Sequence, residues 1–312
     1  MGKQRPFRFG VTERRAANAN EWREKARIAE SHGYSTLNVP DHFGDQLAPI
    51  AALMSAADAT TRLRVGSLVF DNDYRHPVVL AKEAATLDVL SGGRLEFGLG
   101  AGWLVSDYEQ AGIPLDPPGV RIDRMAEALT IIKRLFAGDT VSFTGKHYKV
   151  EGVEPFPSVV QKPHPPIVLG GGGRRMLQLA AREADIVSVN YNLSEGRVNR
   201  KVAQTGLAEA TAEKLLWIKE AAGDRFSEIE LAVSIFVANV TEDRDAMAEA
   251  MAPGIGCEPH DILEIPHFLI GTVEQIIEDL KSRRERYGIS YLAIPGEAAE
   301  AFAPVVERLT GT

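Results

Sequence analysis

Cysteine is the scarcest side chain in this 312-residue sequence, which contains only Cys257. A single cysteine excludes an internal disulfide and the cysteine-rich metal motifs, and no HExxH motif is present, so we expect no metal site. Long apolar runs are missing as well: no stretch approaches the roughly 20 apolar residues of a membrane span. The N-terminus has no apolar run of signal length. We therefore expect a soluble, cytoplasmic protein that makes no contact with a membrane.

Positive charge is also in short supply. The sequence has 35 lysine and arginine residues against 43 aspartate and glutamate residues, which gives a net charge of −8. A chain with this balance does not attract polyanions, so we expect no nucleic-acid partner. Aromatic residues make up only 7% of the chain, whereas alanine and glycine are plentiful, and this balance favours α/β layering over an all-β sandwich.

Short β-rich runs alternate with longer helical patterns along the whole chain. The eight runs are Phe7–Val11, Thr36–Val39, Leu63–Phe70, Arg94–Leu99, Ile167–Leu169, Asp185–Val189, Ile229–Val240 and Ser290–Ile294. Strictly alternating strands and helices require a parallel sheet. Eight such units predict the α/β class and a (β/α)8 (TIM) barrel, with a doubly wound open sheet as the alternative. Because no segment resembles a linker, we expect one barrel domain over residues 1–312.

Three segments interrupt this rhythm. The alternating pattern of Val141–Val150 predicts a small hairpin outside the barrel. Residues 190–205 are long and polar, and residues 252–271 contain three prolines and three glycines. We interpret both as irregular, mobile loops that border a substrate pocket. His260 and His267 lie in the second of these loops and are expected at the surface.

Barrels of this class collect their functional residues at the carboxyl ends of the strands. Asp41 and His42 follow the second run. An imidazole exchanges protons near neutral pH, and a neighbouring carboxylate could orient it or bind a cofactor. The alternative is a turn that caps the next helix. The fourth run leads into Gly98-Leu99-Gly100-Ala101-Gly102-Trp103, and glycines at such a place let the main chain approach a flat ring or a phosphate. A tight loop without a ligand is the other interpretation.

The fifth run enters the turn Gly170-Gly171-Gly172-Gly173, which opens a helix at Arg174. A glycine turn before a helix presents main-chain N–H groups at the positive end of the helix dipole, and the arginine adds a bidentate donor. The turn has no lysine, so it is not a Walker P-loop. It predicts a site for the phosphate of a cofactor, although a flexible start of the helix would give the same pattern.

In their order along the chain, these motifs resemble the bacterial luciferase-like superfamily. The similarity is greatest to the branch that uses the deazaflavin coenzyme F-420. The segments that carry the resemblance are Leu37–Phe43, Arg75–Pro77, Leu80–Asp88, Ser91–Arg94, Gly98–Trp103, Pro165–Gly173 and Phe268–Thr272. The resemblance implies a luciferase-like barrel with insertions, a small-molecule substrate and a homodimer.

The resemblance also implies a reaction and a set of site residues. It implies an oxidoreductase that transfers a hydride between reduced coenzyme F-420 and an organic substrate. Asp41 would bind the deazaflavin, and His42 would handle a proton. A non-proline cis peptide would lie behind the ring, at Ser67–Leu68. Gly100, Ala101 and Gly102 would flank the ring. The phosphate would bind at the remaining positions: Gly170, Gly171, Gly172, Gly173 and Arg174.

One position departs from this pattern. The sugar-phosphate dehydrogenases of the branch carry a catalytic glutamate where this chain has Trp103. The departure disfavours sugar-phosphate oxidation and predicts an aromatic wall for the substrate, with Trp103 in place of the acid. Two alternatives stay open. One is an FMN-dependent monooxygenase supplied by a separate reductase, and the other is a non-catalytic flavin-binding protein.

Overall fold

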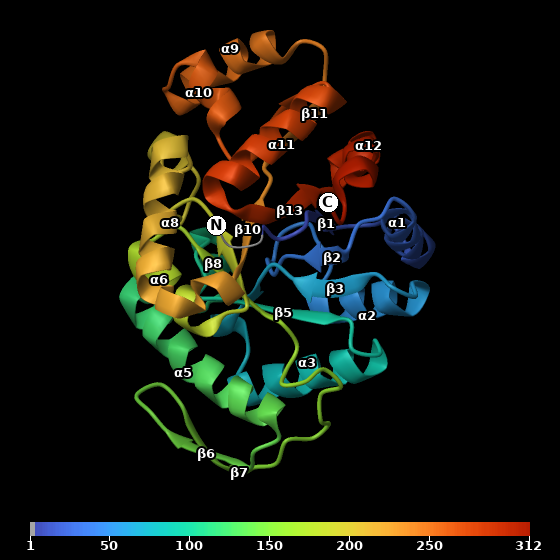
Figure 1. Ribbon diagram of the computed structural model, residues 1–312. Coiled ribbons are helices and arrows are strands. Elements are labelled where there is room, and N and C mark those ends of the chain that lie inside the picture. The colour runs from blue at the N-terminus through green and yellow to red at the C-terminus, as the bar shows by residue number, and fades with distance from the viewer. Residues whose placement is uncertain (1–3) are drawn as a thin grey trace. The chain divides into compact units, whose positions relative to one another are not determined.

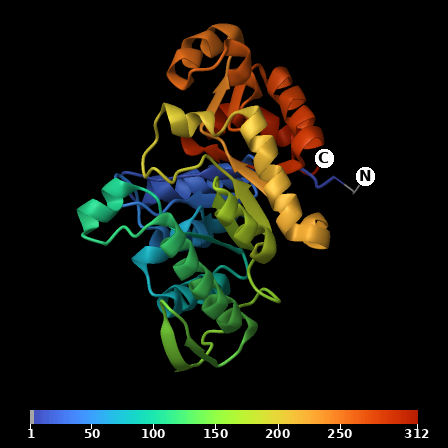
Figure 2. The same cartoon turned by 90° about the vertical axis from the view of Figure 1, so that its left-hand side faces the viewer.

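The structure is a computed structural model that describes residues 4–312, and the chain divides into two compact units (Figures 1 and 2). The first unit holds the N-terminal residues up to Glu13, Ile28–Thr36 and Gly170–Thr312, and the second holds Arg14–Arg27 and Leu37–Leu169. Each unit has its own strands, helices and buried core. The prediction of a single domain over residues 1–312 stays a prediction.

The first unit contains four parallel strands in the order β1, β13, β10 and β9. Their bounds are Arg8–Thr12 for β1, Ile186–Val189 for β9, Glu230–Ser234 for β10 and Ile289–Pro295 for β13. The helices are α6 (Arg174–Glu183), α7 (Arg200–Gln204), α8 (Ala208–Ala222), α11 (Val273–Tyr287) and α12 (Ala299–Leu309). Helices α6 and α8 pack side by side (Figures 1 and 2). All four residues of β9 are buried, as expected of a parallel strand covered on both faces.

A small satellite of the first unit overturns the prediction for residues 252–271. Strands β11 (Val237–Val240) and β12 (Phe268–Gly271) form a parallel pair, and α9 (Arg244–Ile255) and α10 (Pro259–Glu264) occupy the stretch between them. These elements share an apolar core made of Ala248, Ala252, Ile255, Ile262, Ile265, Phe268 and Ile270. The segment is therefore not irregular. Gly256 ends α9 with φ +77° and Pro259 begins α10, where no N–H is needed, whereas Pro253 lies inside α9.

In the second unit, β3, β4 and β8 each pair in parallel with β5. The strands are β2 (Thr36–Val39), β3 (Arg64–Ser67), β4 (Phe70–Asp71), β5 (Leu95–Gly100) and β8 (Ile167–Gly171), and the last of these ends in the first unit. The helices are α1 (Ala19–Ser31), α2 (Pro49–Ala59), α3 (Pro77–Leu90), α4 (Val105–Ala111) and α5 (Pro118–Ala137). Short 3-10 turns cover Asn72–Tyr74, Gly223–Glu228 and Gly296–Ala298.

The predicted hairpin is confirmed. Strands β6 (Val141–Thr144) and β7 (Lys149–Val153) pair antiparallel beside α5, outside the main sheet (Figure 1). Glu127 of α5 holds the hairpin tip, because its carboxylate accepts the main-chain N–H groups of Lys146 and His147 at 2.8 and 2.9 Å. The hairpin is thus an ordered part of the second unit.

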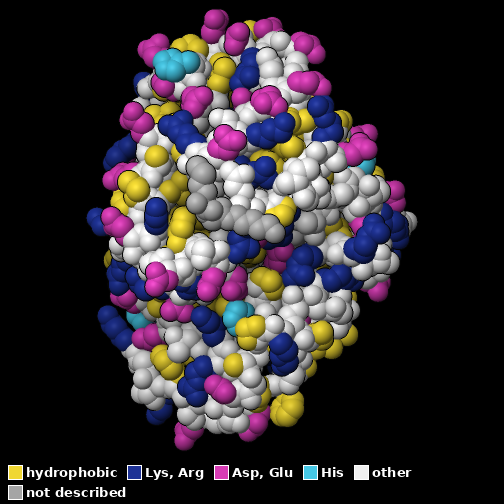
Figure 3. Space-filling view, in the orientation of Figure 1, with side chains coloured by type: hydrophobic (Ala, Val, Ile, Leu, Met, Phe, Trp, Pro, Cys, Tyr) yellow, Lys and Arg dark blue, Asp and Glu magenta, His cyan; other side chains and the backbone are white. Residues whose placement is uncertain are grey.

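The order of elements settles the fold class. Within residues 4–312 the main sheet contains nine strands, and eight of them, each followed by one or more helices, correspond to the eight predicted runs. The fold is a (β/α)8 barrel, as predicted, and not a doubly wound open sheet. None of the helices that the structure describes is long and apolar enough to cross a membrane. Basic and acidic side chains are interspersed over the face shown in Figure 3.

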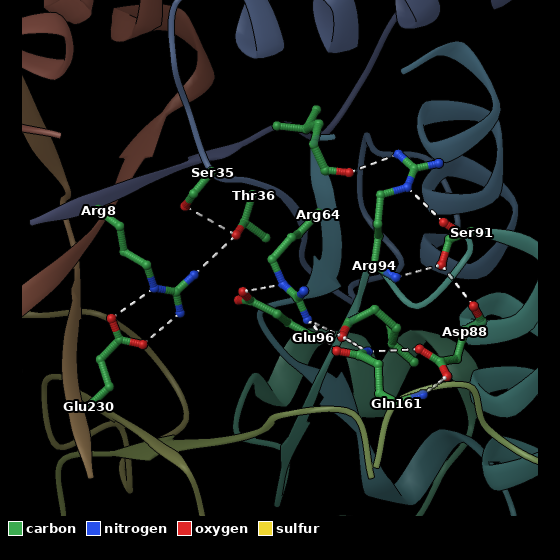
Figure 4. Close-up of polar contacts among 12 residues, drawn as sticks. Arg8, Ser35, Thr36, Arg64, Asp88, Ser91, Arg94, Glu96, Gln161 and Glu230 are labelled. Carbon is green, nitrogen blue, oxygen red and sulfur yellow. Dashed lines mark hydrogen bonds and ion pairs between the residues drawn. The ribbon is translucent and has the colours of Figure 1, made fainter. Parts of the chain in front are cut away.

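Arginine side chains form hydrogen bonds that link separate elements within each unit (Figure 4). In the first unit, Arg8 donates to both carboxylate oxygens of Glu230, at 2.8 and 2.7 Å. In the second unit, the guanidinium of Arg94 donates to the main-chain carbonyls of Ala57 and Leu63, at 2.7 and 2.9 Å. Ala57 lies in the last turn of α2, and its carbonyl also accepts the Thr60 N–H at 3.4 Å. Arg94 therefore ties the end of α2 to the start of β5.

Replacing Arg94 tests this account of the second unit. Arg94→Met removes the hydrogen bonds that a charged donor makes to these carbonyls, so we expect the free energy of unfolding in urea to fall by roughly 2–4 kcal/mol. Arg182→Met, at an exposed position of α6, serves as the matched control and should change it by less than about 0.5 kcal/mol. Equal losses in the two variants would contradict the proposed role of Arg94.

Candidate active site

The main chain between β3 and β4 forms a bulge that contains a non-proline cis peptide. The cis bond joins Leu68 to Val69, so the prediction of Ser67–Leu68 is wrong by one residue. The reason lies in the hydrogen bonding of the preceding residues. The Ser67 hydroxyl and the Leu68 N–H both donate to the carbonyl of Val39, at 2.8 and 3.3 Å. The chain therefore follows β2 through Leu68 and departs only after it.

The glycines of β5 are explained by this bulge. A side chain at Gly98 would collide with the carbonyl oxygen of Ser67, and one at Gly100 would collide with the Val69 side chain. Contacts of this kind cannot be relieved by rotating a flexible side chain, because the first partner is main chain. Gly98 and Gly100 are needed so that the bulge can pack onto β5, whether or not a ligand also lies there.

The loop that follows β5 is shaped by helices α4 and α5. Gly102 has φ +71°, and a side chain there would collide with the Tyr108 hydroxyl and lie 2.6 Å from Asp71 Oδ2. Arg121, a buried residue of α5, donates to the carbonyls of Gly102 and Ala101, at 2.5 and 3.4 Å. The second interpretation of these glycines, a tight loop required by the protein itself, thus holds for the loop geometry. A contact of Gly100, Ala101 and Gly102 with a flat ring stays a prediction.

His42 is held by a buried carboxylate that the sequence reading did not identify. Nδ1 of His42 lies 2.6 Å from Oδ2 of Asp107. Asp107 lies in the first turn of α4, and its side chain is only 4% exposed. A carboxylate can only accept, so Nδ1 donates and the neutral ring carries its lone pair on Nε2. The His42 side chain is 28% exposed. It is therefore an oriented imidazole with one nitrogen available for proton transfer.

Tyr74 supports the same carboxylate. Its hydroxyl donates to Asp107 Oδ2 at 3.3 Å. Burial, together with the negative charges of Asp71 and Asp107, raises the pKa of the Tyr74 hydroxyl, so this hydroxyl stays protonated and remains a donor. Asp107 thus accepts from both a phenol and an imidazole.

Trp103 contacts the His42 ring, and the next residue, Phe43, belongs to a second aromatic pair. Trp103 meets the His42 ring edge to face, with a centroid distance of 5.9 Å and an interplanar angle of 88°. Phe43 is 48% exposed and packs on Tyr74 at 4.5 Å. The structure thus places Trp103 beside His42, and its role as a substrate wall stays a prediction.

Asp41 is engaged by the protein itself. Its carboxylate forms an ion pair with Arg75 and accepts the main-chain N–H of Asp71 at 3.0 Å. Asp41 is 7% exposed. It ties the end of β2 to the end of β4, and the predicted contact with a deazaflavin would be added to these bonds.

Asp71 is the most perturbed carboxyl of this region. Burial raises its pKa to about 7, and the negative charges of Asp73 and Asp41 act in the same direction. The bonds from the Asp73 N–H and the Tyr108 hydroxyl oppose the shift. Asp71 lies against the Gly102 loop: a side chain at Gly102 would touch the Asp71 carboxylate. The charge of the Asp71 carboxyl therefore changes with pH near neutrality, at a position that contacts the loop.

The glycines of the turn in the first unit differ in what a side chain would contact at each position. A side chain at Gly170 would lie 3.0 Å from the Ser188 carbonyl, one at Gly171 would lie 2.6 Å from Met176 Cγ, and one at Gly172 would collide with the main chain of Tyr191. These glycines are required by packing within the first unit. Gly173 differs, because a side chain there would meet only Asn192 Oδ1 at an ordinary 3.7 Å.

The start of α6 fits a phosphate. Gly173 is the N-cap residue and supplies no side-chain cap, so the first-turn N–H groups are not satisfied by it. Arg174 is 60% exposed on its side chain, lies 3.6 Å from Glu220 and sits 5.9 Å over the Trp217 ring. An uncapped helix start with an exposed arginine is a suitable anion site, and it belongs entirely to the first unit.

The two other histidine predictions have different outcomes. His260 is exposed, as expected. His267 is fully buried, so the prediction of a surface position is wrong. Its Nδ1 bonds to the carbonyl of Ser234 at 2.9 Å, and its ring stacks on Phe236 at 5.2 Å. Burial lowers the pKa of His267 to about 3, so the ring is neutral.

With this geometry in place, comparison with known proteins identifies the family. The family model described as luciferase-like monooxygenase matches residues 4–265. The chain therefore belongs to the luciferase-like monooxygenase family. An uncharacterized protein of Mycobacterium tuberculosis is 32% identical over 184 residues, which cover 51% of this chain and 64% of the relative. An FMNH(2)-dependent dimethylsulfone monooxygenase of Pseudomonas putida is 28% identical over 180 residues, covering 56% of this chain and 49% of the relative. The chain thus spans about half to two thirds of the length of these curated relatives.

Solved structures share the fold over nearly the whole chain. A coenzyme F-420-dependent tetrahydromethanopterin reductase from Methanopyrus kandleri has a TM-score of 0.76 at 18% identity and covers 98% of both chains. An F-420-dependent secondary alcohol dehydrogenase has a TM-score of 0.75 at 19% identity, covering 97% of this chain and 99% of that one. The oxygenating constituent of 3,6-diketocamphane monooxygenase from Pseudomonas putida, in complex with FMN, has a TM-score of 0.71 at 17% identity, covering 97% and 96%. The predicted family and the luciferase-like barrel are confirmed.

The pH dependence of stability tests the account of Asp71. Its pKa of about 7 in the folded protein lies above the ordinary value of 3.8 for an aspartate side chain. The folded state thus binds the proton more tightly, so this stabilisation is complete below about pH 4 and is lost as the pH rises through about 7. In the wild type, Asp71 should make the free energy of unfolding fall by up to roughly 1.4 kcal/mol per pH unit between pH 4 and 7. Asp71→Asn should lack this contribution. Asp58→Asn, at an exposed position of α2, should keep the wild-type slope. Parallel curves for wild type and Asp71→Asn would contradict the shift.

Proposed function

We propose that this protein is an oxidoreductase that transfers a hydride between reduced coenzyme F-420 and a small organic substrate. The observation that carries the proposal is the His42–Asp107 pair, a 2.6 Å contact that orients a partly exposed imidazole next to Trp103. The sequence resemblance to the deazaflavin branch supports the choice of coenzyme, as do the F-420-dependent proteins among the structures with this fold.

Within each unit, a separate set of residues is suited to one part of the coenzyme. In the first unit, Gly173, Arg174 and the first-turn N–H groups of α6 would bind the phosphate. In the second unit, the loop of Gly100, Ala101 and Gly102 would flank the ring. When bound, the reduced coenzyme supplies the hydride, and the protein contributes orientation and charge.

His42 would move the proton that accompanies the hydride. Reduction of an acceptor double bond consumes one hydride and one proton, and an imidazole handles protons near neutral pH. Asp107 fixes the Nδ1–H tautomer, so Nε2 is the atom that gains or gives the proton, and the carboxylate stabilises the imidazolium when it forms. In the reverse direction, neutral His42 would act as the base.

The electrostatics around His42 favour an uncharged substrate. The arginines near this point are already committed, Arg75 to Asp41 and Arg124 to Asp73 at 2.8 Å. Four aspartate side chains connect to the same turn through the contacts described above: Asp41, Asp71, Asp73 and Asp107. These carboxylates are buried and outnumber the two arginines, so an anionic substrate would be repelled by the net negative charge, whereas an apolar one would meet aromatic rings. We therefore propose a neutral, apolar acceptor.

An FMN-dependent monooxygenase is the second candidate. The FMNH(2)-dependent relative from Pseudomonas putida favours it. Oxygen consumption by the protein with supplied reduced FMN and a substrate would support this candidate over the first. A non-catalytic flavin-binding protein is the third, and the oriented His42–Asp107 pair argues against it, because binding alone needs no proton donor.

Replacing His42 tests the proposed reaction. In His42→Ala we expect the oxidation rate of reduced coenzyme F-420 by an active acceptor to fall about 100-fold or more, since the proton donor is lost. Coenzyme affinity should stay within about threefold, because the phosphate is held elsewhere. His260→Ala, an exposed histidine of α10, is the matched control and should keep full activity. Full turnover in His42→Ala would refute the proposed role.

The proposed substrate class leads to a separate prediction. Cyclohexenone and its ring-carboxylated analogue form a matched neutral and anionic pair. We expect kcat/KM to be at least about tenfold higher for the neutral member, which corresponds to roughly 1.4 kcal/mol. Trp103→Ala should lower kcat/KM for the neutral compound through loss of the aromatic wall. A preference for the anionic member would show that the substrate class is wrong.

A further inference from the structure

A buried lysine lies behind the glycine turn of the first unit. Lys214 of α8 is 2% exposed, and its Nζ donates to the main-chain carbonyls of Asn190, at 2.7 Å, and Thr205. These two residues are the ends of the segment that joins β9 to the end of α7. Neither bond involves a carboxylate. Burial lowers the pKa of Lys214 to about 8, and the neighbouring Glu213 opposes the shift.

A buried ammonium without a carboxylate partner is unusual, because taking a charge out of water is costly unless that charge is compensated. His267 adds no second positive charge, since its ring is neutral. The charge of Lys214 is compensated by the two main-chain carbonyls and by the neighbouring Glu213. Both carbonyls are therefore held firmly to the lysine.

The segment that Lys214 holds lies directly on the glycine turn. The Asn190 N–H donates to the Gly171 carbonyl at 2.9 Å. The main chain of Tyr191 and Asn192 packs so closely on Gly172 that no side chain would fit there. Asn190 thus links the lysine to the turn: its carbonyl accepts from Lys214 Nζ, and its N–H donates to the Gly171 carbonyl.

The same segment is fixed from the other side. The Tyr191 ring packs on Phe236 and on His267, each at 4.8 Å. The Asn192 N–H donates to the Thr205 hydroxyl at 2.8 Å. The backbone at residues 190–192 is therefore held by a cation and by an aromatic cluster, and its Asn192 side chain is the group nearest the open face of Gly173.

We propose that Lys214 is a positioning residue for the phosphate site at Gly173 and Arg174. Lys214 acts through residues 190–192, whose main chain it holds against the turn by its hydrogen bond to Asn190. It makes no direct contact with the phosphate in this proposal. This inference rests on the proposed function, because it concerns the phosphate of the same coenzyme.

The test compares ligands with and without a phosphate. We expect Lys214→Met to weaken the binding of coenzyme F-420 by about tenfold or more, as loss of hydrogen bonds from a charged group does. Binding of the phosphate-free deazaflavin riboside should change by less than about threefold. Lys214→Gln keeps a donor for one carbonyl but removes the charge, and it should give an intermediate loss. Lys219→Met, exposed on the same helix, is the control and should bind like wild type.

The outcomes separate the two claims. If the wild-type protein binds FMN instead, the same comparison is made between FMN and riboflavin. If wild type shows no preference for the phosphate-bearing member of either pair, the proposed phosphate site fails, and this inference fails with it. If wild type has that preference and Lys214→Met keeps it, only the role of Lys214 is overturned. Faster hydrogen exchange at the Tyr191 and Asn192 amides in Lys214→Gln is expected, and unchanged exchange would also overturn that role.

Discussion

The packing of the bulge after β3 onto the glycines of β5 is the constraint on which the second unit's site depends. Ser67 and Val69 occupy the space that side chains at Gly98 and Gly100 would fill. This close approach brings β4 alongside β5, and the end of β4 presents Asp71 to Asp41. The turn that carries His42 is thereby fixed, and Asp107 reaches it from α4. A larger residue in β5 would displace the bulge first and the acid–base pair as a consequence.

The first unit uses the same physical device at another place. Three glycines of the turn after Ile167–Leu169 exist because Ser188, Met176 and Tyr191 pack against them, and only Gly173 faces outward. The turn is thus rigid on the protein side and open at the start of α6. A rigid anion site loses little conformational freedom on binding, which favours affinity. Lys214 extends this rigidity to the segment that covers the turn.

Much of the fold could be predicted because it is written in local patterns. Alternating runs with period two and stripes with period 3.6 located the eight β/α units, and the strand ends located Asp41, His42 and Trp103. What could not be predicted depends on distant contacts. Asp107 is 65 residues from His42, and α4 is only seven residues long, so no periodic pattern marks it. The stretch 252–271 contains prolines and glycines that are typical of irregular loops, yet Pro253 lies inside α9, Gly256 ends this helix and Pro259 begins α10. The position of the cis bond follows from hydrogen bonds to Val39 that no local pattern reveals.

The central claim is that this member of the luciferase-like family binds the deazaflavin coenzyme and uses it for hydride transfer. Equilibrium titration of the purified protein with coenzyme F-420 and, separately, with FMN tests that claim most directly. The account predicts saturable binding of coenzyme F-420 at micromolar concentration or below, and weaker binding of FMN. Tight binding of FMN, with no binding of coenzyme F-420 at micromolar concentration, would contradict it.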